Sequence, residues 1–105
     1  MTIRFVDIDG TICITPGTDY EEAEPIRERI DKFNAFFDAG DVIVYWSARG
    51  AKTGRDWTEL TYQQLKQWGA KYHSVRFDKP VFDVLYDDKA ERPTTETPNG
   101  KSDAA

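Results

Sequence analysis

The sequence predicts an α/β protein in which helices flank a parallel β-sheet. Short runs of β-branched and apolar residues at 3–8 and 42–46 are typical of strands that are buried on both faces. Each run is followed by a segment with helical spacing of apolar residues, and strands that alternate with helices favour parallel pairing. At 105 residues, 39% of them hydrophobic, the chain is long enough for one domain of this class.

Turn-forming residues at 10–23 separate the first strand from the first helix, and they predict a small flap with a hairpin at 11–14. The helix is expected to begin at Pro25 and to end at Gly40, because proline suits a first helical position and glycine suits a helix end. Helical spacing assigns its buried face to Ile26, Ile30, Phe33 and Phe37.

The second helix is predicted by a capping-box pattern of Asp56 with Glu59 and by a glycine, Gly69, at its end. Its buried stripe is expected to comprise Trp57, Leu60 or Thr61, Leu65 and Trp68. Two further strands are expected within residues 73–77 and 81–86.

Residues 1–92 are expected to form the single domain, and residues 93–105 are expected to form a disordered tail because they have almost nothing to bury. The net charge of −5 disfavours nucleic acid as a partner. No apolar run reaches the roughly 18–20 residues of a membrane span, the start has no signal-peptide layout, and Cys13 has no partner for a disulfide. We therefore expect a cytoplasmic protein with no membrane partner.

Charged and polar residues lie near the carboxyl ends of the predicted strands. They are Asp7, Asp9, Ser47, Arg49, Lys79, Asp87 and Asp88. Parallel sheets bind ligands beyond these strand ends, so we expect the side chains to converge. Four carboxylates packed together repel one another, and a hard cation such as Mg²⁺ would relieve that repulsion while leaving room for a substrate phosphate. The pattern therefore predicts a magnesium site that binds phosphate.

Taken in order, these residues resemble the four motifs of the haloacid dehalogenase superfamily. The matching stretches are Asp7-Ile8-Asp9-Gly10-Thr11 for the first motif (DxDGT), Ser47 for the second, Lys79 for the third and Asp87-Asp88 for the fourth. The resemblance covers residues 3 to about 92, and it implies the Rossmann-like sheet of that superfamily.

The resemblance also implies a Mg²⁺-dependent phosphomonoesterase that works through an aspartyl-phosphate. Asp7 would be the nucleophile, and Asp9 would protonate the leaving oxygen and then activate water. Ser47 would bind a phosphoryl oxygen, and Lys79 would hold Asp7 and the phosphate together. The implied metal ligands are Asp7, Asp9, Asp87 and Asp88. The implied substrate contacts are Gly10, Thr11, Ser47, Ala48, Arg49 and Lys79.

The segments where superfamily members often carry a cap domain are short here, so we expect a capless enzyme. An open site suits a bulky substrate or one that a second copy of the chain encloses, which makes a homo-oligomer an expectation. The expected substrate is a small phosphate ester, such as a phosphorylated sugar or a nucleotide. A polynucleotide end is an alternative, because Arg49 is similar to an arginine in the phosphatase half of polynucleotide kinases. A receiver-like phospho-accepting module and a non-catalytic phosphate-binding domain are further alternatives.

Overall fold

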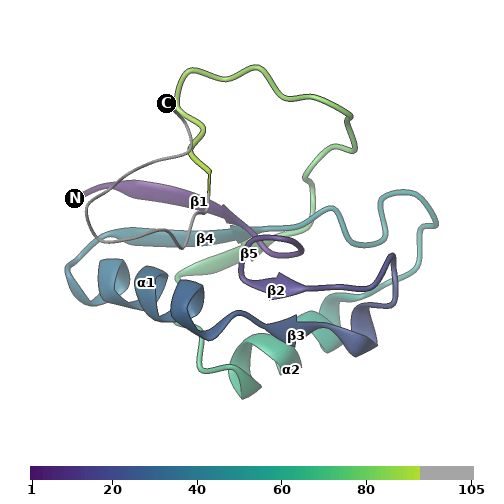
Figure 1. Cartoon of the computed structure of the whole chain (residues 1–105), viewed down its shortest axis with the longest axis horizontal. Coiled ribbons are helices and arrows are strands. Elements are labelled where there is room, and N and C mark those ends of the chain that lie inside the picture. Colours follow the sequence, from purple (N-terminus) through teal and green to yellow (C-terminus); the bar gives the residue numbers. More distant parts are fainter. Residues whose placement is uncertain (93–105) are drawn as a thin grey trace.

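A three-stranded parallel sheet forms the centre of the computed structural model, which describes residues 1–92 (Figure 1). The strands are β1 (Ile3–Asp7), β4 (Val42–Trp46) and β5 (Ser74–Arg76), and they lie in the order β1-β4-β5. Asp7 pairs with Trp46, which in turn pairs with Arg76, so the carboxyl ends of all three strands are aligned. The α/β class with a parallel sheet is confirmed.

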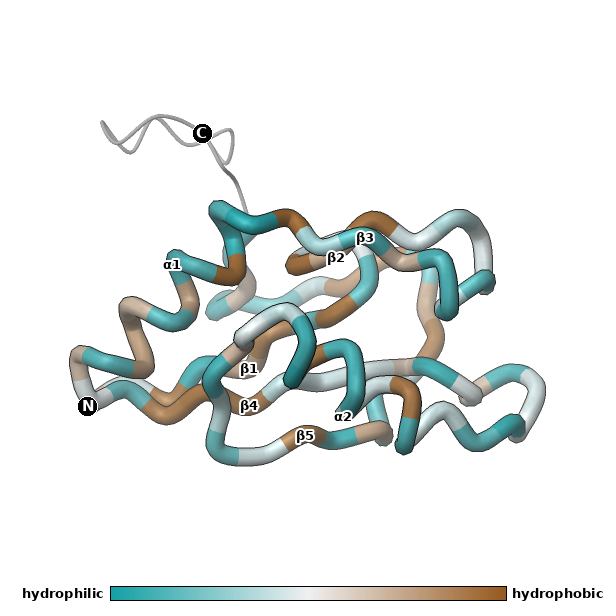
Figure 2. The backbone as a smooth tube through the Cα atoms, turned by 90° about the horizontal axis from the view of Figure 1, so that it is seen from below, coloured by the Kyte–Doolittle hydropathy of each residue, from teal (hydrophilic) through white to brown (hydrophobic). Residues whose placement is uncertain are grey.

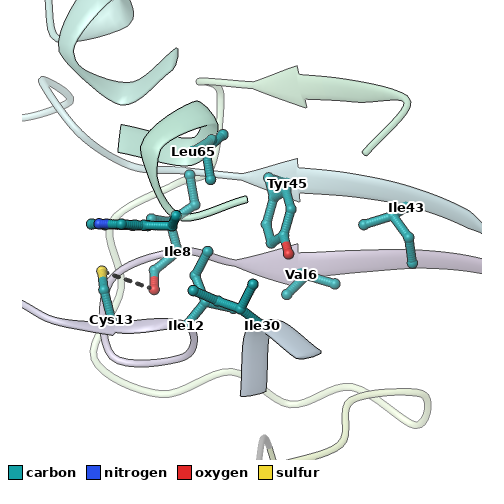
Figure 3. Packing of buried hydrophobic residues seen from close by; sticks show 9 residues of the cluster. Val6, Ile8, Ile12, Cys13, Ile30, Ile43, Tyr45 and Leu65 are labelled. Carbon is teal, nitrogen blue, oxygen red and sulfur yellow. Dashed lines mark hydrogen bonds between the residues drawn. The ribbon is translucent and has the colours of Figure 1, made fainter. Parts of the chain in front are cut away.

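Two helices, α1 (Arg27–Asp38) and α2 (Thr58–Gln67), pack on the same face of this sheet (Figure 1). The core contains Val6 and Tyr45 from the sheet, Ile30 from α1 and Leu65 from α2 (Figure 3). Along β1, the residues that alternate with Val6 point to the other face of the sheet, where the side chains of Ile3 and Phe5 are exposed. Helices on both faces were expected, and for residues 1–92 this expectation is wrong. Figure 2 shows that apolar residues are concentrated on β1 and β4, while α1 alternates between polar and apolar positions.

Between β1 and α1 the chain forms a small flap, as expected (Figure 1). Its strands, β2 (Cys13–Ile14) and β3 (Glu24–Pro25), pair in an antiparallel manner and enclose a 3-10 turn, η1 (Tyr20–Glu22). The hairpin expected at 11–14 is therefore wrong, because β2 pairs with a strand ten residues further along. Pro25 ends this ladder, and α1 begins two residues later than predicted.

The predicted helix ends are confirmed. Gly40 and Gly69 follow α1 and α2 with φ angles of +101° and +71°, which glycine adopts without the steric cost of a Cβ atom. The predicted capping box of Asp56 with Glu59 is wrong, because the N-cap of α2 is Trp57 and its side chain forms no cap hydrogen bond. Asp56 lies one residue earlier, and its carboxylate accepts a hydrogen bond of 2.9 Å from the backbone N–H of Thr58. The buried stripe of α2 contains Thr61, Gln64, Leu65 and Trp68.

The predicted fourth strand within residues 81–86 is wrong. This segment has no regular structure and is exposed throughout, and in Figure 1 it arcs over the side of the sheet opposite α1 and α2. A parallel strand needs a crossover of roughly a dozen residues or more, whereas only residues 77–80 separate β5 from this run. The predicted tail at 93–105 lies outside the described residues.

Candidate functional site

Asp7, the last residue of β1, lies beside a lysine from a distant part of the chain. The Asp7 Oδ1 atom is 3.0 Å from Lys79 Nζ, and Thr11 Oγ1 donates a hydrogen bond of 3.3 Å to Asp7 Oδ2. The side chains of Asp7 and Lys79 are 33% and 17% exposed, so the pair is accessible from solvent but partly desolvated. A carboxylate that an ammonium and a hydroxyl group hold in place at a strand end can act as a nucleophile.

Ser47 and Lys79 lie together at the same edge of the sheet. The backbone N–H of Lys79 donates to the Ser47 carbonyl oxygen at 3.2 Å, and the Ser47 N–H donates to the carbonyl oxygen of Arg76 at 2.8 Å. The Ser47 hydroxyl is buried and accepts a hydrogen bond of 3.0 Å from the backbone N–H of Arg49. Asp7, Ser47 and Lys79 therefore lie at one edge of the sheet, where a side-chain contact joins Asp7 to Lys79 and a backbone contact joins Lys79 to Ser47.

Asp9 is held by a buried arginine. Arg49 donates from Nε to Asp9 Oδ2 and from Nη2 to Asp9 Oδ1, both at 2.9 Å, and Thr15 Oγ1 donates to Oδ1 at 2.6 Å. Burial alone would raise the pKa of Asp9, but the hydrogen bonds and the charge of Arg49, together with Thr15, lower it below its ordinary value. Asp9 was expected to protonate the leaving oxygen, which requires a protonated carboxyl group. In this arrangement it is an anion, because its charge has a specific cationic partner.

Arg49 uses its remaining donors inside the protein. Its side chain is fully buried, and Nη1 donates to Thr61 Oγ1 at 3.0 Å and to Gln64 Oε1 at 2.7 Å. Gln64 in turn donates from Nε2 to the carbonyl oxygen of Tyr20 at 2.6 Å. Arg49 was predicted to contact substrate, whereas here it joins the first motif, α2 and the flap.

Thr15, Thr61 and Gln64 also belong to the site, and none of them was predicted from the sequence. The available signal was on α2, where Thr61 and Gln64 are polar residues three positions apart on an otherwise apolar face. Buried polar side chains require partners, so this pair indicates an internal donor such as an arginine.

Gly10 and Thr11 form a tight turn after β1. The Gly10 N–H donates to the Cys13 carbonyl oxygen at 2.8 Å and the Thr11 N–H donates to the Ile8 carbonyl oxygen at 3.1 Å. Both backbone donors are therefore used within the turn. The Thr11 hydroxyl donates to Asp7 and so lies beside the predicted nucleophile.

Asp87 and Asp88 are not assembled with the other predicted metal ligands. Both are exposed, and Asp87 Oδ1 accepts a hydrogen bond of 2.8 Å from the backbone N–H of Lys89. Within residues 1–92, no group of three or more His, Cys, Asp or Glu side chains is placed to hold a metal ion. The donor set described here does not fit Mg²⁺, because Asp7 and Asp9 already have cationic partners and no third carboxylate joins them.

Comparisons with known proteins support the fold and give no function. The chain resembles a crystal structure of a structural-genomics target from Vibrio cholerae, with a TM-score of 0.75 and 24% sequence identity over 89% of this chain and 85% of that one. No protein-family model and no curated protein matches the sequence. Among the described residues, no helix is both long enough and apolar enough to cross a membrane.

Proposed function

We propose that this chain is a phosphomonoesterase in which Asp7 accepts the phosphoryl group from a small phosphate ester. The observation that carries the proposal is the Asp7–Lys79 pair, 3.0 Å apart at the carboxyl end of β1, with the Thr11 hydroxyl on the other carboxylate oxygen. The resemblance of the four motifs to those of the haloacid dehalogenase superfamily supports the same chemistry, and Ser47 lies at the same strand ends.

The residues suggest how the reaction would run. An Asp7 oxygen attacks phosphorus, the bond from phosphorus to the leaving oxygen breaks, and an aspartyl-phosphate forms. The Lys79 ammonium lies where it would reduce the charge repulsion between the carboxylate and the incoming phosphate. Water then hydrolyses the acyl-phosphate and restores Asp7.

The role of Asp9 follows from its ionised state. Because Arg49 and Thr15 hold Asp9 as an anion, Asp9 has no proton to donate, and we assign it the role of a general base that accepts a proton from the attacking water. Protonation of the leaving group, the other role implied by the resemblance, would require Asp9 to separate from Arg49. Mg²⁺ stays a prediction from the motifs, and no step is assigned to it because the described side chains do not form its site.

The proposal can be tested by phosphate release from p-nitrophenyl phosphate and acetyl phosphate, with and without Mg²⁺. Asp7→Asn should abolish release, while Asp78→Asn, a matched change of an exposed carboxylate after β5, should retain it. Rapid acid quenching followed by mass spectrometry should detect one added phosphoryl group on Asp7 in the wild-type protein. Full activity in the Asp7→Asn variant would contradict the proposed nucleophile.

The same experiment separates the alternative classes. A stable phosphoryl adduct on Asp7 without turnover would indicate a receiver-like phospho-accepting module. Phosphate binding without an adduct or release would indicate a binding domain. Dependence of turnover on Mg²⁺ would establish the predicted cofactor, and equal rates after chelation would exclude it.

A further inference from the structure

A hollow of about 420 Å³ lies between the flap and the loop that follows β4. Residues 18–21 of the flap form one wall, side chains between residues 48 and 57 form the other, and Val81 lies at its margin. Two of the residues that line the hollow are close in sequence to the proposed site: Ala48 directly follows Ser47, and Val81 comes two residues after Lys79. The backbone hydrogen bond from Lys79 to Ser47 keeps these two strand exits together.

Aromatic rings line the hollow. The rings of Tyr20 and Trp57 meet edge to face with centroids 4.9 Å apart, and the Arg55 guanidinium lies 4.1 Å from the centre of the Trp57 ring. Such a wall favours contact with a planar or ring-shaped group, because aromatic edges and faces attract other rings. A phosphoryl group alone, which has no ring, would gain nothing from this aromatic wall.

The charges around the hollow are balanced. Asp19 and Glu21 contribute two carboxylates, and Lys52 and Arg55 contribute two cations. Arg55 and Glu21 form an exposed ion pair across the two walls, at 3.9 Å. This balance disfavours a polyanion and favours a neutral group with several hydroxyls, which can donate to the carboxylates and accept from the cations.

The walls are held by Arg49, which binds Asp9, and by Thr61 and Gln64, which bind Arg49. Gln64 binds the Tyr20 carbonyl oxygen, and the Arg49 guanidinium lies 4.8 Å from the centre of the Tyr20 ring. On the other wall, Thr61 Oγ1 donates to the carbonyl oxygen of Trp57 at 2.8 Å. The hollow is therefore largely preformed, as ligand pockets usually are, and its volume lies within the roughly 300–1,000 Å³ typical of them.

From these observations we infer that the hollow binds the leaving group of the substrate and that this group is a nucleoside. The inference rests on the proposed phosphatase activity and narrows its substrate to nucleoside monophosphates. The base would lie against Tyr20 and Trp57, and the ribose hydroxyls would donate to Asp19 and Glu21. The ester oxygen leaves phosphorus with its electron pair and takes a proton from solvent, while phosphorus bonds to Asp7. Water then releases inorganic phosphate, so the products are nucleoside and phosphate.

The test compares substrates that do and do not reach the hollow. We would measure kcat/KM for AMP, GMP, CMP, UMP, glucose 6-phosphate and acetyl phosphate, the last having a leaving group too small to occupy the hollow. Trp57→Leu should lower kcat/KM for at least one nucleotide about tenfold, the effect of ~1.4 kcal/mol in binding, and should leave acetyl phosphate hydrolysis unchanged. Tyr62→Leu, which removes an exposed aromatic ring elsewhere on α2, is the matched control and should change neither.

A second variant and a binding measurement keep the test independent of folding and of catalysis. Thr53→Trp, at an exposed lining position, should fill the hollow and give the same selective loss as Trp57→Leu. Calorimetric titration of Asp7→Asn with the preferred nucleoside, which carries no phosphate, should show binding that Thr53→Trp abolishes.

Each outcome bears on one of the two proposals. Equal losses for nucleotide and acetyl phosphate, or a clear preference for glucose 6-phosphate, would overturn the nucleoside assignment while the phosphatase proposal stands. If no ester is hydrolysed but a nucleoside binds and Thr53→Trp prevents it, the hollow is a nucleoside site and the phosphatase proposal fails. The absence of both hydrolysis and nucleoside binding would overturn both.

Discussion

The contact between Arg49 and Asp9 should be one of the strongest polar interactions in this protein. The variant Arg49→Met would leave Asp9, Thr61 and Gln64 without four hydrogen bonds of 2.7–3.0 Å. Removal of one partner from a buried ion pair typically costs about 3–5 kcal/mol. Because the Asp9 side chain is 27% exposed, we expect the lower end of that range, about 3 kcal/mol of the free energy of unfolding.

A double-mutant cycle isolates the pairwise part of this free energy. Arg49→Met, Asp9→Asn and the double variant would be unfolded in urea at pH 7 and followed by tryptophan fluorescence and circular dichroism. We expect a coupling free energy of about 2 kcal/mol, within the range for residues in direct contact. The exposed pair Lys71–Asp38 on the protein surface is the matched control, and its cycle should give no more than about 0.5 kcal/mol. A coupling for Arg49 and Asp9 as small as the control would refute the reasoning.

The coupling should also depend on pH in one direction. Burial alone would raise the pKa of Asp9, but the hydrogen bonds and charge of Arg49, together with the hydrogen bonds of Thr15 and Cys13, lower it below its ordinary value of 3.8 in the folded protein. A group of this kind stabilises the fold above its unfolded pKa, and the stabilisation is lost as the pH falls through the folded pKa. The coupling should therefore be constant from pH 7 to about pH 5 and decline below pH 3.8. A decline near neutral pH would contradict the assignment of Asp9 as an anion.

Three further outcomes are expected. Gly50→Ala should lower the free energy of unfolding by about 2 kcal/mol, because Gly50 has a φ of +83° and an added Cβ would collide with the carbonyl oxygen of Arg55. Gly54→Ala is the control: Gly54 has a φ of +74° with open space around it, so the same urea assay should show a loss of about 1 kcal/mol. Burial raises the pKa of the Cys13 thiol to about 11, so iodoacetamide at pH 8 should modify it at least about 100-fold more slowly in the folded protein than in urea. Lys79→Met should lower kcat/KM for phosphate release about 100-fold and change the free energy of unfolding by no more than about 1 kcal/mol. A large loss of stability with intact turnover would contradict the proposed role of Lys79.

The parts of the fold that follow from local sequence were predictable. The runs that form β1 and β4 are apolar enough to define buried strands, and Gly40 and Gly69 mark helix ends through their positive φ angles. The fourth strand was not predictable in this way. The composition of residues 81–86 suits a strand, but strand formation also requires a connection long enough to return the chain to the sheet, and residues 77–80 are short for that.

In the candidate site, too, some contacts could be predicted from the sequence and others could not. Asp7, Ser47 and Lys79 could be placed together because parallel strands bring their carboxyl ends to one edge. The contact between Arg49 and Asp9 could not be predicted in this way, because it depends on the Arg49 side chain turning inward to contact α2. Sequence position alone does not distinguish an arginine that faces a substrate from one that faces the core.

Because Arg49 turns inward and binds Asp9, the charge repulsion from which Mg²⁺ was predicted is smaller than expected. The prediction of Mg²⁺ assumed that four carboxylates gather at the sheet edge and repel one another. In the structure only two of them lie there, and each has its own cation: Asp7 has Lys79, and Asp9 has Arg49. The fold therefore needs no metal ion to neutralise this edge. A dianionic phosphate placed beside Asp7 would add negative charge that Lys79 alone does not balance, so any requirement for a divalent cation should come with the substrate rather than with folding.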